Sequence, residues 1–101
     1  MTNNNYTRYV VLINNIPNMT NTEALIKAHV AHLKKLEAQG KIELCGPLID
    51  FNGGMVIYKN CTLEDAHKFA QDDPFIAQKC KTYQIRTMEL SCAQNNHLGM
   101  G

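Results

Sequence analysis

The stretch YTRYVVLI, residues 6–13, decides the fold. It is rich in aromatic and β-branched residues, a composition that favours a β-strand. Its last four residues, Val10 to Ile13, are all apolar. Because successive strand side chains point to opposite faces, an unbroken apolar run predicts a strand buried on both faces. The sheet that holds this strand therefore needs a cover on each side.

The rest of the chain alternates between helix and strand signals. Thr20 to Glu23 has the capping-box pattern, with Thr20 as the predicted cap, and Gly40 is a natural residue to follow the helix end. Thr62 to Asp65 repeats the pattern for a second helix. We expect a helix to about residue 39, strands over 41–49 and 55–59, a helix over 63–71, a helical turn over 75–79 and a strand over 81–90.

Two details of these elements matter for the site. The stretch 41–49 alternates so that Ile42 and Leu44 share one face, and Pro47 predicts an edge strand because proline cannot donate to a ladder. On a helical wheel, one face of the first helix collects the apolar residues. This predicted buried stripe consists of Leu25, Ile26, Val30, Leu33 and Leu36.

The order is β-α-β-β-α-β, which predicts an α+β, ferredoxin-like fold. Four antiparallel strands form the sheet, and both helices cover one face. The other face is left open, and an identical sheet is the simplest cover, so we expect a face-to-face homodimer. One domain spans residues 1–101, with a core over about 6–90 and a flexible tail over 91–101.

Composition excludes several classes of protein. The chain has 101 residues, 45% of them hydrophobic, and a net charge of +1, which argues against a disordered tail and against binding nucleic acid mainly by charge. No apolar run is long enough for a membrane helix. The polar start, Met1 to Asn5, has no basic region typical of a signal peptide. We therefore expect a cytoplasmic protein with free thiols at Cys45, Cys61, Cys80 and Cys92, packed as small apolar side chains.

An RNA-recognition domain shares the β-α-β-β-α-β order and is the alternative to consider. The stretch Val11 to Pro17 superficially resembles its first RNA-binding segment, but Leu12 stands where the stacking aromatic belongs. The strand near Gly53 to Tyr58 lacks the paired exposed aromatics and the basic residue of the second segment. With a net charge of +1, no nucleic-acid partner is expected.

Two histidines of the first helix fall near its apolar stripe. His29 lies within the stripe, and a core histidine bonded to a backbone carbonyl is the favoured interpretation, because a buried imidazole needs a partner. His32 lies at the stripe edge, where a functional role in a cleft and a structural role in the core are equally plausible interpretations. The HxxH spacing invites a zinc site, but no glutamate lies between the two and no third ligand has a recognisable spacing, so no metal is expected.

Asp73 is the carboxylate that could complete such a site. Asp73 before Pro74 is typical of a helix cap with proline in the first turn, which alone explains the pair. A carboxylate that accepts from Nδ1 of histidine also fixes the tautomer and leaves Nε2 for proton transfer. The Gly46-Pro47 pair is either an edge-strand kink or a bend that opens room beside the first helix.

In this order and spacing, several short motifs resemble the YCII-related domain family over about residues 6–90. These are His32-Leu33, Gly40, Gly46-Pro47-Leu48, Gly53-Gly54, Glu64-Asp65-Ala66 and Asp73-Pro74-Phe75. The resemblance implies a dimeric α/β barrel of ferredoxin-like protomers and a His–Asp pair in a cleft, which carries over to His32 and Asp73. Many relatives carry an arginine one turn before the histidine, where this chain has His29, which implies a different substrate or a missing anion contact.

The resemblance implies chemistry that needs a proton shuttle and no cofactor. One characterised relative eliminates chloride from a chlorinated hydroxyquinone, and similar barrels isomerise muconolactone. We therefore expect a lyase or isomerase for a small, cyclic or aromatic substrate, with His32 and Asp73 as catalytic residues. His29, Gly46, Pro47 and Phe75 are the expected substrate-binding residues. The alternative is a non-catalytic dimeric module that binds a small ligand, in which Asp73 is only a helix cap.

Overall fold

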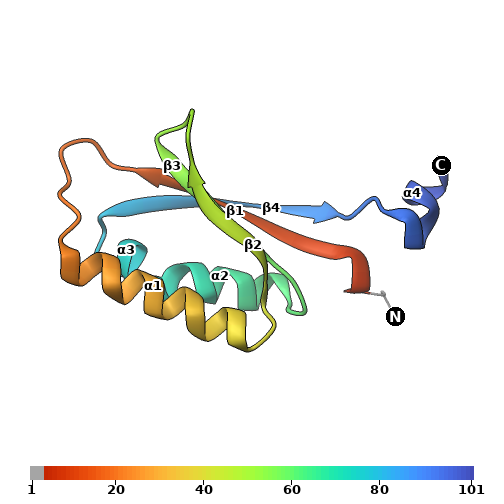
Figure 1. Ribbon diagram of the computed structural model, residues 1–101, viewed down its shortest axis with the longest axis horizontal. Coiled ribbons are helices and arrows are strands. Elements are labelled where there is room, and N and C mark those ends of the chain that lie inside the picture. The colour runs from red at the N-terminus through yellow and green to blue at the C-terminus, as the bar shows by residue number, and fades with distance from the viewer. Residues whose placement is uncertain (1–3) are drawn as a thin grey trace.

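A computed structural model describes residues 4–101 (Figure 1). The first three residues of the polar start, part of the argument against a signal peptide, lie outside this range. The elements in chain order are η1 (Asn4–Tyr6), β1 (Thr7–Asn15), α1 (Glu23–Ala38), β2 (Ile42–Leu48), β3 (Gly53–Tyr58), α2 (Leu63–Asp72), α3 (Pro74–Ala77), β4 (Lys81–Glu89), η2 (Ala93–Asn95) and α4 (Asn96–Gly99).

The sheet has four strands in the order β2-β3-β1-β4, and every neighbouring pair is antiparallel. Its two central strands are β3 and β1, and β1 pairs with β3 on one side and with β4 on the other. Helices α1, α2 and α3 lie together on one face of the sheet (Figure 1). The predicted α+β, ferredoxin-like arrangement is confirmed, and β2 is the edge strand that Pro47 predicted.

The core lies between the sheet and its helical layer. Alternate residues of β1, namely Tyr9, Val11 and Ile13, are buried. Val56 pairs with Val11, and Tyr58 pairs with Tyr9, so these cross-strand neighbours face the helices together. They pack in one cluster with Leu36 of α1 and with Ala66 and Ala70 of α2.

The opposite sheet face carries the remaining apolar residues of the central strands. Val10 and Leu12 of β1 alternate with the buried set, and their β3 partners are Ile57 and Met55. All four are half-buried, and within residues 4–101 no helix covers this face (Figure 1). We refer to this surface, defined by these four residues, as the open sheet face.

Two local predictions are wrong at the ends of elements. Helix α1 is capped by Thr22, and not by Thr20, because the Thr22 hydroxyl accepts from the Leu25 amide at 3.1 Å. In β2 a register shift between Ile42 and Leu44 breaks the alternation. Ile42 is therefore buried while Leu44 is 51% exposed, and the two do not share a face.

Other end signals act as predicted. Gly40 has φ of +72° after α1, a backbone conformation that glycine adopts without strain. Helix α2 begins with a complete capping box between Thr62 and Asp65. Its hydrogen bonds to Thr62 hold the pKa of the Asp65 carboxyl below its ordinary value.

The stretch 91–101, expected as a flexible tail, carries η2 and α4. In α4 the backbone of Asn96, His97 and Leu98 is left-handed, so the segment is a tight irregular coil. It lies beyond the end of the sheet, apart from α1, α2 and α3 (Figure 1). Within residues 4–101, no helix is long and apolar enough to cross a membrane.

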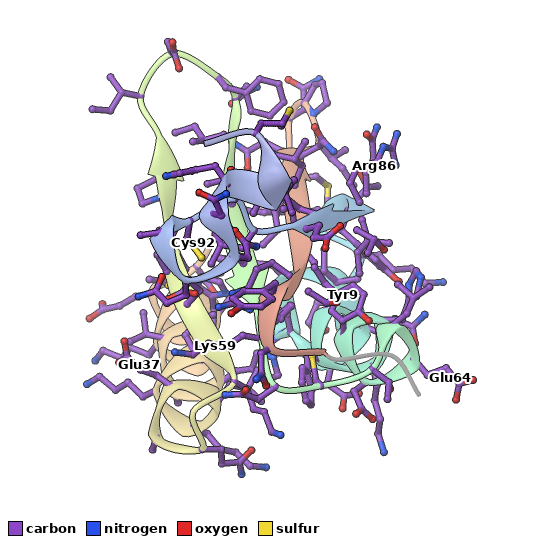
Figure 2. All side chains as sticks on the ribbon, turned by 90° about the vertical axis from the view of Figure 1, so that its right-hand side faces the viewer. Tyr9, Glu37, Lys59, Glu64, Arg86 and Cys92 are labelled. Atoms are coloured by element: carbon purple, nitrogen blue, oxygen red, sulfur yellow. The ribbon has the colours of Figure 1, made fainter. Side chains whose placement is uncertain are left out.

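Charged side chains lie on the outer surface of the helical layer and on the open side of the sheet. Figure 2 shows Glu37 of α1 and Glu64 of α2 pointing outward on opposite sides of that layer. Arg86 of β4 is exposed and is paired with Val10 across the strands, so it lies on the open side of the sheet. The interior of the protein, by contrast, holds one buried charged side chain in the described residues, that of Asp73.

Candidate active site

The most distinctive polar contact inside the protein joins α1 to the start of α3. Nδ1 of His29 lies 2.9 Å from Oδ1 and 2.8 Å from Oδ2 of Asp73. The Asp73 side chain is 2% exposed and the His29 side chain is 17% exposed. A buried carboxylate that faces Nδ1 requires a proton on that nitrogen, so it selects the tautomer with Nε2 unprotonated or the imidazolium.

This pairing differs from the predicted one. The expectation that His32 pairs with Asp73 is wrong, because Nε2 of His32 lies 2.8 Å from the Phe69 carbonyl oxygen. The two histidines have exchanged their expected environments: His32 has the backbone-carbonyl partner that was predicted for His29. One helical turn separates them, and only the position of α3 decides which ring meets the carboxylate.

Asp73 has a second partner, the one that local sequence predicts. Its Oδ1 accepts from the Phe75 amide at 3.0 Å, and Pro74 occupies the first turn of α3. Proline is favoured there because its missing N–H would have no partner in the helix anyway. The same carboxylate therefore caps α3 and holds His29, so the cap fixes the orientation of the oxygen atoms that the imidazole meets.

A cleft of about 420 Å³ opens beside this pair. It lies between α1, the β2–β3 hairpin, β1 and the segment from α3 to β4. Its lining is mostly apolar, a composition typical of sites for small organic ligands. The lining residues are Ile13, Ile26, His29, Val30, Leu33, Cys45, Gly46, Pro47, Gly53, Gly54, Met55, Val56, Phe75 and Lys81.

The four expected substrate-binding residues, His29, Gly46, Pro47 and Phe75, all lie on this cleft. His32 does not line it. Ile26 and Val30, predicted in the buried stripe of α1, are 44% and 40% exposed. Both side chains line the cleft, so the stripe predicted as buried is open to it at these two positions.

Glycine makes room for the cleft at the β2–β3 hairpin. A Cβ atom on Gly53 would run into the carbonyl oxygen of Ile13, which belongs to the neighbouring strand. Strand β1 can therefore approach the hairpin only at a residue without a side chain. Gly53 and Gly54 both line the cleft, and neither position puts a side chain into it.

The aromatic ring of Phe75 contacts both His29 and Lys81, two residues that line the cleft. The His29 ring lies 4.3 Å from it, centroid to centroid, and the Lys81 ammonium lies 4.2 Å from the Phe75 centroid. Lys81 was not among the predicted site residues. The sequence signal that could have placed it is the alternation of Tyr83 and Ile85 with the polar Thr82 and Gln84, which puts Lys81 on the face of Tyr83 and Ile85; the structure half-buries that face.

Other reactive groups near the cleft are held in their neutral forms. Burial, with a smaller contribution from Glu37, raises the pKa of the Cys45 thiol, so this cysteine is a poor nucleophile at neutral pH. Burial also raises the pKa of Tyr58, and the charge of Asp73 adds to the effect. All four cysteines are free, but the exposed Cys45 does not pack as the predicted apolar filler.

His29 Nε2 remains for chemistry. Among residues 4–101 it has no hydrogen-bond partner, whereas Nδ1 is committed to Asp73. An imidazole oriented in this way can accept a proton at Nε2 and return it. Over the same residues, no group of three or more histidine, cysteine, aspartate or glutamate side chains is placed to hold a metal ion.

Comparisons with known proteins agree with the fold. The structure resembles that of 5-chloro-2-hydroxyhydroquinone dehydrochlorinase (TftG) from Burkholderia phenoliruptrix AC1100, in complex with 2,5-dihydroxybenzoquinone. The TM-score is 0.57 at 21% sequence identity, over 81% of this chain and 91% of that one. No curated protein matches the sequence. The family model of the YCII-related domain matches residues 7–89, and the chain therefore belongs to the YCII-related domain family.

Proposed function

We propose that this protein is a lyase or isomerase that moves a proton on a small cyclic substrate, with His29 as the general acid and base. The observation that carries the proposal is the contact between Nδ1 of His29 and the buried Asp73 carboxylate. Nε2 has no hydrogen-bond partner among residues 4–101, and His29 lines the cleft. His29 takes the role expected for His32, whose ring is bound to a carbonyl.

Asp73 acts in this proposal as a positioning residue. It keeps the proton on Nδ1 and stabilises the imidazolium that forms when Nε2 accepts a proton. Because its Oδ1 also caps α3, its position is fixed before any ligand binds. A preoriented base of this kind contributes typically 10²- to 10⁴-fold to the rate.

The elimination step balances without an external oxidant or reductant. The substrate reacts as its keto tautomer, in which the ring carbon next to a carbonyl group is saturated. Nε2 of His29 takes a proton from that carbon, and the electron pair of the C–H bond forms a new double bond. The leaving group on the adjacent carbon departs with the electron pair of its own bond. In an isomerase, the imidazolium returns the proton to a different carbon and no group leaves.

The structural neighbour supports the substrate class. It is named as a dehydrochlorinase and holds a dihydroxybenzoquinone, a single six-membered ring. The apolar lining and the volume of about 420 Å³ suit a ligand of that size in this chain. A homodimer formed through the open sheet face belongs to the same proposal, because that face leaves apolar side chains half-exposed in the single chain.

Two histidine variants test the proposal. His29→Asn keeps an N–H near the Nδ1 position for Asp73 and removes Nε2. His32→Gln keeps an N–H for the Phe69 carbonyl and is the matched control on the same helix. The substrates are 5-chloro-2-hydroxyhydroquinone, followed by chloride release, and 2,5-dihydroxybenzoquinone in deuterium oxide, followed by mass spectrometry for exchange of ring hydrogen.

We expect the wild-type protein to accelerate at least one reaction. His29→Asn should lose at least about 10²-fold in rate, and His32→Gln should stay within about threefold of the wild type. Equal activity of His29→Asn and the wild type contradicts the proposal. So does a wild-type protein that binds the quinone and accelerates neither reaction, a result that instead supports a non-catalytic binding module.

A further inference from the structure

We propose that Lys81 makes the cleft selective for anionic ring compounds, by binding a negatively charged oxygen while His29 faces a ring carbon. The inference rests on the proposed function and names the substrate class of that site: a planar ring with an ionised enol, phenol or carboxyl oxygen. It follows from the placement of Lys81 with respect to Phe75 and His29.

Charge distinguishes Lys81 from the rest of the cleft. Among the arginines and lysines of residues 4–101, only Lys81 lines it. Its ammonium forms no ion pair with a carboxylate of those residues, whereas Arg8 and Lys59 reach Glu43 and Lys27 reaches Glu23. The Lys81 side chain is half-buried, and its ammonium rests on the Phe75 ring. A cation held against apolar walls without a counter-charge favours an anionic ligand.

The geometry places Lys81 and His29 within reach of one small ligand. Lys81 Nζ and the His29 ring lie 4.2 and 4.3 Å from the same Phe75 centroid. They are therefore separated by no more than the sum of these two distances, and both line the same cleft, so one substituted six-membered ring bound there can reach both. A ring that places an anionic oxygen at Lys81 can present a carbon to His29.

Phe75 keeps both groups at this spacing. It is 6% exposed, and its own amide is held by Asp73, the residue that also holds His29. Asp73 therefore fixes the position of His29 and of Phe75, and the Phe75 ring in turn holds the Lys81 ammonium. An anionic ligand would draw the ammonium from the ring face, because a charge-assisted hydrogen bond is stronger than most cation–π contacts.

The negative charge of Asp73 does not cancel this preference. Asp73 is 2% exposed and bonded to His29, so it offers no free oxygen to the cleft. Glu37, which contributes to raising the pKa of Cys45, is on the exposed side of α1 and does not line the cleft. Lys81 is therefore the charge that a ligand in the cleft meets directly.

Binding of a charged and a neutral probe tests the inference without requiring turnover. The probes are 2,5-dihydroxybenzoquinone, which is ionised at neutral pH, and its neutral analogue 2,5-dimethoxybenzoquinone, each titrated by calorimetry. The variants are Lys81→Met, which removes the charge with little change in length, and Lys81→Arg, which keeps it. Lys79→Met is the matched control, since Lys79 is exposed in the same segment and does not line the cleft.

We expect Lys81→Met to weaken binding of the ionised quinone about tenfold or more and binding of the neutral analogue less than about twofold. Lys81→Arg should recover most of the loss, Lys79→Met should behave as the wild type, and added salt should weaken only the charged probe. Equal weakening of both probes in Lys81→Met, no weakening of either, or a wild-type protein that binds neither overturns the inference. A loss of turnover in His29→Asn does not enter this measurement, so the two proposals fail separately.

Discussion

Replacing Asp73 by asparagine is the sharpest perturbation of the site, because asparagine can keep the cap and must change the contact with His29. The cap needs an oxygen at the Oδ1 position, 3.0 Å from the Phe75 amide. The amide nitrogen then takes the Oδ2 position, 2.8 Å from Nδ1 of His29 in the wild-type protein. An N–H group there donates to Nδ1, so we expect the imidazole proton to move to Nε2.

The expected magnitudes follow from these contacts. A hydrogen bond to a charged group contributes about 1.5–3 kcal/mol and a neutral one about 1 kcal/mol, so Asp73→Asn should lose about 1–2 kcal/mol of stability. Asp73→Ala also loses the cap, worth about 1 kcal/mol, and leaves a void, so its loss should reach about 3 kcal/mol. Turnover should fall about 10²-fold or more in both variants, since Nε2 no longer starts unprotonated in the asparagine variant.

Two assays separate the structural role of Asp73 from the positioning role. Urea unfolding gives the two stability losses. Long-range ¹H–¹⁵N correlation spectra give the tautomer of His29, which a mere helix cap would not change; His32→Gln removes the neighbouring imidazole signal and aids assignment. The reasoning is refuted if His29 in folded Asp73→Asn keeps its proton on Nδ1 and the variant retains full activity.

Three further predictions test contacts outside the His29–Asp73 pair. Arg8 Nε donates to Glu43 at 2.8 Å and holds the pKa of that carboxyl below its ordinary value. The pair therefore stabilises the fold above the unfolded pKa of about 4.3, and this stability is lost as the pH falls through the folded pKa. Glu43→Gln should cost up to about 1 kcal/mol of unfolding free energy at pH 7 and nothing near pH 2, and an equal loss at both pH values would contradict this role of the pair. Gly53→Ala should destabilise by about 1–3 kcal/mol in urea unfolding, because its Cβ meets the Ile13 carbonyl; an unchanged midpoint would show that the hairpin can shift. Leu12→Glu on the open sheet face should convert the expected dimer to a monomer in sedimentation velocity, and a monomeric wild-type protein would exclude the pairing.

Local sequence rules succeeded where one element determines its own geometry. The order of strands and helices, the glycine after α1 and the capping box at Thr62 are confirmed. The unbroken apolar run of β1 predicted burial on both faces; in the single chain one face is buried and the other is half-buried, so burial of the second face stays a prediction. At Leu44 the rule failed, because a register shift in the ladder depends on the partner strand and is not visible in the alternation of one segment.

The sequence by itself also determined that Asp73 caps a helix and that His29 and His32 lie near one face of α1. Three residues along a helix differ by about 60° in direction, so a wheel places both rings toward the interior and cannot choose between them. Only the tertiary structure decided the choice, by setting α3 against α1 so that the carboxylate meets His29 while His32 meets the Phe69 carbonyl. The same packing brought Lys81, six residues beyond Phe75 in the chain, onto that ring. Contacts between separate elements depend on how those elements pack together, and no single segment contains that information.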